Sequence, residues 1–175
     1  MKICWVISEE AQVDQQPQGE LITIAEAWGS WRTYKEYKTT NCVCSDKSEA
    51  SKLIKQNFQA ISNLYVMQES FLALDCPTGV KVFGGKFGSD NISNKDDIVA
   101  LNLAVPQYDL ILLFGFDFQP TTDRGRDEYY FNVKELIKSN PTTQFVLVDY
   151  AFEMDDWELD NLTEDTVESV MSLLG

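Results

Sequence analysis

The chain contains no histidine, and this absence excludes several kinds of catalytic site. Ser-His-Asp and Cys-His catalysis and histidine general bases all need an imidazole, and so do most zinc sites. Basic residues are also scarce, because 14 Lys and Arg stand against 28 Asp and Glu in 175 residues, a net charge of −14. A sequence pI near 4.2 leaves little basic surface for phosphate backbones, so we expect no direct nucleic-acid binding.

Long apolar runs are missing too. No stretch of about 18 apolar residues occurs, so the sequence predicts no membrane span. The apolar stretch at the start is short and runs into Ser8, Glu9 and Glu10, which is typical of a first strand and not of a secretory signal. We therefore expect a cytoplasmic protein.

What the chain does have is a pattern of alternating strands and helices. Its length and 44% hydrophobic content fit one domain, residues 1–175. Apolar runs predict strands at 1–8, 39–45, 80–83, 110–114 and 144–150, and the segment 21–27 is either a strand or a helix start. Helical spacing predicts helices at 46–65, 94–105 and 126–139, and a terminal helix capped by Asn161 or Thr163. This alternation predicts a three-layer α/β, Rossmann-like domain with a mainly parallel sheet of five or six strands.

The four cysteines are Cys4, Cys42, Cys44 and Cys76. Cys42 and Cys44 form a C-x-C pair within a predicted strand, which directs both side chains to one face. A zinc site needs two ligand pairs, and Cys4 and Cys76 each stand alone. We favour buried free thiols.

Polar residues follow the predicted strands at the edge where open parallel sheets bind ligands. They are Ser8 and Glu9, Ser45 and Asp46, Gly84 and Gly85, Gly115 and Asp117, and Asp149. Carboxylates that meet there can hold Mg²⁺, and Asp117 and Asp149 are the metal ligands we expect if any metal binds. The alternative is that Asp46 caps a helix and the other acids are solvated turn residues. No cofactor is required by the sequence.

Phosphate-binding motifs are absent, since neither G-x-x-x-x-G-K-[ST] nor G-x-G-x-x-G occurs. Two other segments of the chain are candidates for binding an anion. Gly29, Ser30 and Arg32 lie at a predicted turn and helix start, where the alternative is that Trp28 and Trp31 anchor the turn in the core. Arg124 and Arg126 precede a helix after the Asp117 strand, and we expect them to contact the anionic part of a substrate.

The carboxyl-terminal segment 149–175 is acidic and contains no Lys or Arg. Its nine acids are Asp149, Glu153, Asp155, Asp156, Glu158, Asp160, Glu164, Asp165 and Glu168. Asp155, Asp156, Trp157 and Glu158 combine charge with an aromatic anchor, which suits a protein partner with a basic surface. The alternative is a solvated surface with Trp157 in the core.

Three stretches of the chain resemble small uncharacterised proteins of tailed phages of aquatic bacteria: Trp28-Gly-Ser-Trp-Arg-Thr-Tyr34, Leu112-Leu-Phe-Gly-Phe-Asp117 and Gln144-Phe-Val-Leu-Val-Asp149. That group has no assigned activity, so the resemblance implies only a viral protein in the host cytoplasm or the virion. The strand end Gly115-x-Asp117 is similar to strand ends in Rossmann-like glycosyltransferases, although the histidine usual there is absent.

Two functions follow from these observations. The first is a non-catalytic phage accessory or virion-associated protein that acts through protein–protein interaction. The second is a Mg²⁺-dependent enzyme that binds a nucleotide or sugar phosphate at the carboxyl edge of the sheet. It would use Asp117 and Asp149 on the metal, and Ser8, Gly115, Arg124 and Arg126 around the ligand.

Overall fold

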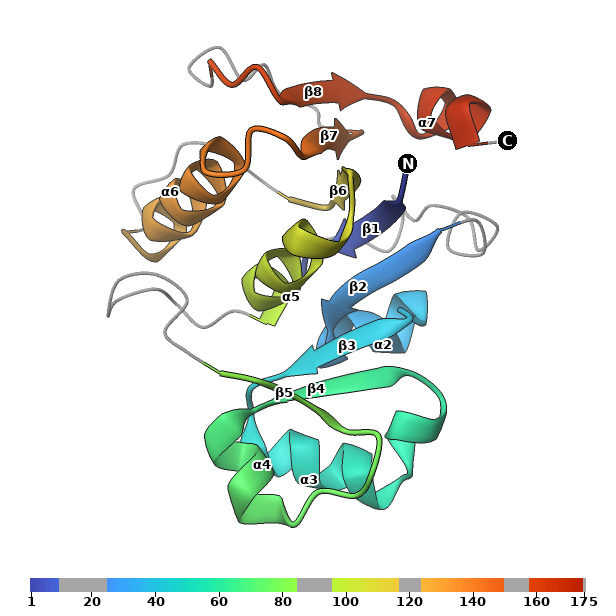
Figure 1. The fold of residues 1–175 in the computed structure, drawn as a ribbon, viewed down its shortest axis with the longest axis vertical. Helices are drawn as coiled ribbons and strands as arrows, with labels where there is room; N and C mark the ends of the chain where they lie inside the picture. Colours follow the sequence, from blue (N-terminus) through green and yellow to red (C-terminus); the bar gives the residue numbers. More distant parts are fainter. Residues whose placement is uncertain (10–24, 85–95, 117–123, 150–157, 175) are drawn as a thin grey trace.

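The computed structural model describes residues 1–9, 25–84, 96–116, 124–149 and 158–174, with only the backbone of residues 124–130 (Figure 1). The described strands form one eight-stranded sheet in the order β5-β4-β3-β2-β1-β6-β7-β8. The strands are β1 (Ile3–Ile7), β2 (Glu26–Ser30), β3 (Asn41–Cys44), β4 (Asn63–Met67), β5 (Lys81–Phe83), β6 (Leu110–Phe114), β7 (Gln144–Val148) and β8 (Leu162–Asp165).

All seven pairings between neighbouring strands are parallel. This confirms the predicted Rossmann-like α/β fold, but the sheet has eight described strands where we expected five or six. The middle strands are short runs of apolar residues, such as Leu110–Phe114, as expected for strands with helices on both faces of the sheet.

Helices cover both faces of the sheet. The face that carries Trp5, Cys42 and Leu64 packs against one set of helices. They are α2 (Trp31–Tyr37), α3 (Lys47–Lys55), α4 (Gln68–Leu74) and α7 (Val167–Leu174). The opposite face, which carries Val6 and Leu113, packs against α5 (Asp96–Ala104) and α6 (Arg124–Lys138). The 3-10 turns at Phe58–Ala60 and Val105–Gln107 complete the described elements.

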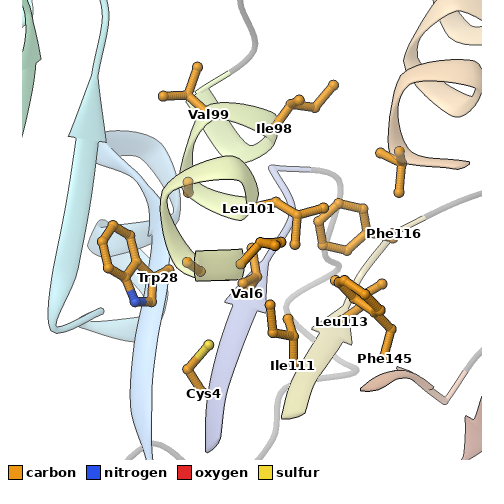
Figure 2. Close-up of a cluster of buried hydrophobic side chains, with 14 of the residues drawn as sticks. Cys4, Val6, Trp28, Ile98, Val99, Leu101, Ile111, Leu113, Phe116 and Phe145 are labelled. Atoms are coloured by element: carbon orange, nitrogen blue, oxygen red, sulfur yellow. The ribbon is translucent and has the colours of Figure 1, made fainter. Parts of the chain in front are cut away.

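The largest core cluster lies beneath α5 and α6. Figure 2 shows Leu101 of α5 next to Val6 of β1, and Phe116 beside Leu113 of β6. Five of the seven residues of α5 that follow the acidic pair at its start are buried, because this mainly apolar helix contacts β1, β2 and β3 at once. The first residues of α5 are therefore held against the middle of the sheet.

The sheet is strongly twisted. In Figure 1 the arrows of β2 and β8 point to opposite sides of the view, although every neighbouring pair is parallel. A twist of about 20–25° per pair accumulates to roughly 80–100° over the four pairings that separate β2 from β8. Strands β4 and β5 with α3 and α4 lie at one end of the long axis, β1 lies between, and β8 with α7 lies at the other end (Figure 1).

The described part of the chain holds no helix long and apolar enough to cross a membrane.

Three expectations about local structure were wrong. The predicted helix 46–65 ends at Lys55, and Asn57 takes a left-handed conformation with φ of 55°, so Leu64 and Tyr65 belong to strand β4. Gly29 and Ser30 are the last residues of β2 and not a tight turn.

The third error concerns the end of the chain. Thr163 lies in strand β8, and Asn161 precedes that strand, so neither caps the terminal helix. Helix α7 is capped instead by Thr166, whose hydroxyl accepts the backbone N–H of Ser169 at 3.2 Å. The sequence pattern did not predict β8, the four-residue strand that lies between β7 and α7.

Candidate functional site

The strand order changes direction between β1 and β6. From β1 the chain proceeds through β2, β3, β4 and β5 on one side, and from β6 through β7 and β8 on the other. In open α/β sheets the segments that leave two such strands diverge, and the crevice between them is the usual ligand site. The residues at this switch point are Ser8 and Glu9 after β1, and Gly115 and Phe116 after β6. The backbone N–H of Ser8 bonds the carbonyl of Phe114 at 2.9 Å, which holds the two exits together.

Asp97, at the start of α5, is completely buried beside this point. Its Oδ2 accepts the hydroxyl of Ser8 at 2.9 Å and the backbone N–H of Glu9 at 3.2 Å. Its Oδ1 accepts the N–H of Ile98 at 2.8 Å. A buried carboxylate is tolerated only with such partners, so Asp97 fixes the β1 exit against α5. Ser8 therefore lies where we expected it, but its hydroxyl is engaged by an acid that the sequence analysis did not identify.

Asp96, the neighbouring acid, reaches the exit of β3 and is also buried, with 4% of its surface exposed. Its Oδ1 accepts the backbone N–H of Ser45 at 3.0 Å. Burial raises the pKa of Asp96 to about 6, with the Glu9 and Asp97 carboxylates adding to that effect and hydrogen bonds from Ser45 opposing it. An acidic carboxyl group that titrates near neutral pH thus lies behind the switch point.

Glu9 forms an ion pair with Arg32 from the first turn of α2, at 2.9 Å. The Glu9 carboxylate raises the pKa of the Arg32 guanidinium above its ordinary value. The second carboxylate oxygen of Glu9, Oε1, is buried and has no hydrogen-bond partner among the described residues. Glu9 therefore connects the exit of β1 to the helix after β2, and it has capacity for one further donor.

The start of α2 is organised by Ser30, whose Oγ accepts the backbone N–H groups of Arg32 at 3.1 Å and Thr33 at 3.3 Å. The donors that we expected to face an anion are thus already paired within the protein. Gly29 allows this helix start to approach the strand. A Cβ at that position would collide with Oγ1 of Thr33 and lie 3.1 Å from Cγ2 of Thr39. Trp28 is 1% exposed and packs in the core, as in the structural alternative for this segment.

Gly115 follows β6 with φ of 74°, a conformation that favours glycine, and Phe116 then turns into the core. Asp117 lies outside the described residues. Helix α6 begins at Arg124, and because it returns antiparallel to β6, its amino terminus lies at the carboxyl edge of the sheet. The backbone thus brings Arg124 and Arg126 to the same edge as the switch point, although nothing is described of their side chains.

The other predicted strand-end residues have structural partners. Asp46 caps α3, since its Oδ1 accepts the N–H of Glu49 at 2.8 Å, as we predicted. Asp149 follows β7 with φ of 51°, and its Oδ1 accepts the N–H of Val167 at 3.0 Å at the start of α7. Gly84 is described and follows β5, whereas Gly85 is not described. Among the described side chains, no three His, Cys, Asp or Glu residues are placed to hold a metal ion together.

The thiols agree with the prediction of buried free cysteines. Cys4, Cys42 and Cys44 are buried and free, and Cys76 is free and half-buried. Cys42 and Cys44 pack in one cluster while Val43 packs in the cluster on the other face, which confirms the same-face arrangement. Burial raises the pKa of the Cys44 thiol to about 12 and also raises that of Cys42. These thiols are therefore not nucleophiles at neutral pH.

The predicted partner-binding segment is only partly described. Asp155, Asp156 and Trp157 lie outside the described residues, and Glu158 is exposed. Acids on β8 and α7 continue this surface, because Asp160, Glu164 and Glu168 are also exposed. Their side chains form no ion pair with any described basic residue.

A groove of about 660 Å³ lies at the opposite, amino edge of the sheet. It is lined in part by Lys2, Glu26 and Tyr108. The Tyr108 hydroxyl donates to Glu26 Oε2 and accepts Trp28 Nε1–H at 3.3 Å. Partial burial and the Glu26 carboxylate raise the pKa of Tyr108 above its ordinary value. The Tyr108 hydroxyl and the Glu26 carboxylate of this groove are thus hydrogen-bonded to each other.

The chain was compared with protein-family models, with curated proteins and with solved structures, and none of the three comparisons finds a match. The resemblance to phage proteins stays an expectation for that reason.

Proposed function

We propose that the domain binds a nucleotide or a sugar phosphate at the carboxyl edge of its sheet, between the segments that follow β1 and β6. The observation that carries the proposal is the reversal of strand order between these two strands. Ser8 and Glu9 directly follow β1, and Gly115 directly follows β6.

The chemistry of the edge supports an anionic ligand. Helix α6 is 15 residues long and begins at this edge, so its amino terminus offers a partial positive charge. Arg124 and Arg126 are in its first turn. Asp117, two residues after Gly115, would hold a magnesium ion beside the phosphate. The paired Glu9 and Arg32 lie on the other side of the crevice, where Arg32 can exchange its partner for the ligand.

A thermal-shift screen of nucleotides, nucleotide sugars and sugar phosphates, with and without Mg²⁺, tests this proposal. A ligand at a hundred times its Kd stabilises the native state by about 2.7 kcal/mol. For a domain of this size that stabilisation raises Tm by roughly 5–10 °C. The double variant Arg124→Ala/Arg126→Ala should lose the shift. Lys134→Ala/Lys138→Ala, at the other end of the same helix, should keep it. A panel without any shift would contradict the proposal.

A second function is supported by a different observation, the charge of the carboxyl-terminal end. The exposed acids on and around β8 and α7 lack basic partners among the described residues, which suits contact with a basic protein surface. Binding of a fluorescent oligolysine peptide tests it. Affinity should fall sharply in Asp160→Lys/Glu164→Lys and much less in Glu69→Lys, an exposed acid on α4. Equal losses in both variants would show that only net charge matters.

A further inference from the structure

The basic residues of this acidic protein are unevenly distributed. Residues 31–55 contain six of the 14 Lys and Arg and only three acids, a local net charge of +3 within a chain of −14. The six are Arg32, Lys35 and Lys38 on or next to α2, and Lys47, Lys52 and Lys55 on α3. All six are exposed. We call this surface the α2–α3 basic face.

Helices α2 and α3 form a single surface because they pack on the same face of the sheet. Trp31 and Tyr34 of α2 pack against the same buried cluster as Leu53 and Ile54 of α3. The ring of Tyr34 also meets the ring of Phe58, just after α3, with centroids 4.5 Å apart. The two helices therefore present their outward side chains together.

Aromatic rings hold several of these cations in place. Lys35 Nζ lies 4.7 Å from the centroid of the Trp31 ring, and the Arg32 guanidinium lies 5.0 Å from the same centroid. Lys38 Nζ lies 5.1 Å from the Tyr34 ring. Such contacts reduce the freedom of long side chains without neutralising them, so the charge remains available to an anionic partner.

Most of this positive charge is not neutralised within the chain. Arg32 pairs with Glu9, and Lys52 pairs with Glu49. No described carboxylate lies within ion-pair distance of Lys35, Lys38, Lys47 or Lys55. The carboxyl-terminal segment from Asp149 onward has the opposite charge imbalance, since its sequence contains acids and no basic residue.

The fold separates the two charged surfaces. Helices α2 and α3 flank β2 and β3, whereas β8 is an edge strand, separated from β2 by β1, β6 and β7. With the long axis vertical in Figure 1, β8 and α7 lie at the top and α2 and α3 in the lower half. The two surfaces of one molecule are thus separated along the sheet, and a second molecule can bring them together.

We propose that the α2–α3 basic face docks the acidic end of a second copy of this chain, formed by the exposed acids Glu158, Asp160, Glu164 and Glu168. This inference rests on the second proposed function and names its partner. The charges of the two surfaces are complementary, and attraction over a few ångströms persists at physiological salt, where the Debye length is about 8 Å. Because the contact joins two different surfaces, it produces head-to-tail oligomers or, if two contacts close, a dimer.

The experiment measures the solution mass of the full chain by light scattering and sedimentation velocity over a range of concentrations, in about 50 and 500 mM NaCl. The wild-type mass should exceed 19.9 kDa at the lower salt and return to 19.9 kDa at the higher salt. Lys35→Glu/Lys38→Glu and Asp160→Lys/Glu164→Lys should each be monomeric alone. An equimolar mixture of the two variants should associate again, because each reversed surface then meets an opposite charge.

Two controls make the result specific. Lys2→Glu/Lys81→Glu changes the net charge by the same amount as Lys35→Glu/Lys38→Glu, but at exposed sites away from α2 and α3, and should associate like the wild type. Circular dichroism verifies that every variant is folded. A loss of association in this control would overturn the proposal, and so would a mixture that stays monomeric.

The failure of this inference differs from the failure of the function on which it rests. A wild-type chain of 19.9 kDa at every concentration and salt overturns the inference. If that chain still binds oligolysine through Asp160 and Glu164, interaction with another basic protein stands. If it does neither, both proposals fail.

Discussion

The hydroxyl of Ser8 donates a hydrogen bond of 2.9 Å to the buried carboxylate of Asp97, 89 positions further along the chain. This contact joins the exit of the central strand β1 to the start of helix α5. The same carboxylate accepts the backbone N–H of Glu9, so one buried acid sets the geometry of the residues at the switch point.

Asp97→Ala is expected to destabilise the protein by about 2–4 kcal/mol, because it removes the hydrogen bonds that this buried carboxylate accepts from two backbone N–H groups and from the Ser8 hydroxyl. Chemical denaturation measures the change in unfolding free energy. Glu69→Ala, which removes an exposed acid on α4, is the control and should change stability far less. Similar losses in the two variants would mean that the Asp97 contacts contribute little.

Asp96 makes the stability of the protein depend on pH. Its pKa is raised from 3.8 to about 6, so the native state takes up a proton that the unfolded chain has already released. This contribution is therefore largest at acid pH and is lost as pH rises from about 4 to about 6. Asp96→Asn should remove it, so the variant should gain up to about 3 kcal/mol relative to wild type across that window.

Denaturation curves at several pH values measure this difference, with Glu69→Gln as a control for the loss of one exposed acid. A constant difference between wild type and Asp96→Asn from pH 4 to 7 would contradict the assignment.

Gly29→Ala is expected to cost about 1–3 kcal/mol, because the new Cβ would collide with Oγ1 of Thr33 at the start of α2. Thr33→Ala removes that oxygen, so the cost of Gly29→Ala should be smaller in this background. A double-mutant cycle measured by thermal unfolding gives the coupling between the two sites. Additive effects would show that the collision is relieved in some other way.

Asn161 should be sensitive to substitution because its side-chain amide joins three backbone carbonyls. Nδ2 donates to the carbonyls of Ile137, Asn140 and Thr143 at 3.0–3.1 Å, where α6 connects to β7. Asn161→Ala should cost about 1–3 kcal/mol. Asn161→Asp should cost more at neutral pH than at pH 4, because an ionised carboxylate would face those oxygens. Equal effects at both pH values would contradict this role.

Cysteine reactivity should follow burial. In native protein an aromatic disulfide reagent should modify Cys76 first, because Cys4, Cys42 and Cys44 are buried. In denaturant all four thiols should react. Cys76→Ser should abolish the fast phase. Rapid reaction of a second thiol in the native state would indicate that a buried cluster opens.

The architecture could be predicted from the sequence where strands are continuous apolar runs. Leu110–Phe114 and Gln144–Val148 are buried on both faces and carry no competing signal. Strand β4 was missed because Phe58, Ile61, Leu64 and Tyr65 also fit helical spacing. The helix ends for a local reason, because Asn57 takes a left-handed conformation. Leu64 and Val66 then lie at alternating buried positions of strand β4.

The site was predicted less completely than the fold. Ser8, Ser45 and Asp46 lie at strand ends as expected, but Asp96 and Asp97 were not identified. An acidic pair at the start of a helix is normal for an exposed helix, where it favours the helix dipole. Their burial follows from partners that lie 51 and 89 positions away, at Ser45 and Ser8, and no local pattern contains that information.

The position of β1 has a consequence for synthesis of the protein. This strand lies between β2 and β6, with Ile3 opposite Leu110, so one of its two edges is unpaired until residues 110–114 leave the ribosome. The sheet cannot close around its first strand during translation of the intervening hundred or so residues, and contacts of such long range form slowly. A nascent chain or truncated fragment that stops before Leu110 would therefore expose Cys4, Trp5 and Val6 as an open, apolar strand edge, which is the surface that chaperones protect and that aggregates join.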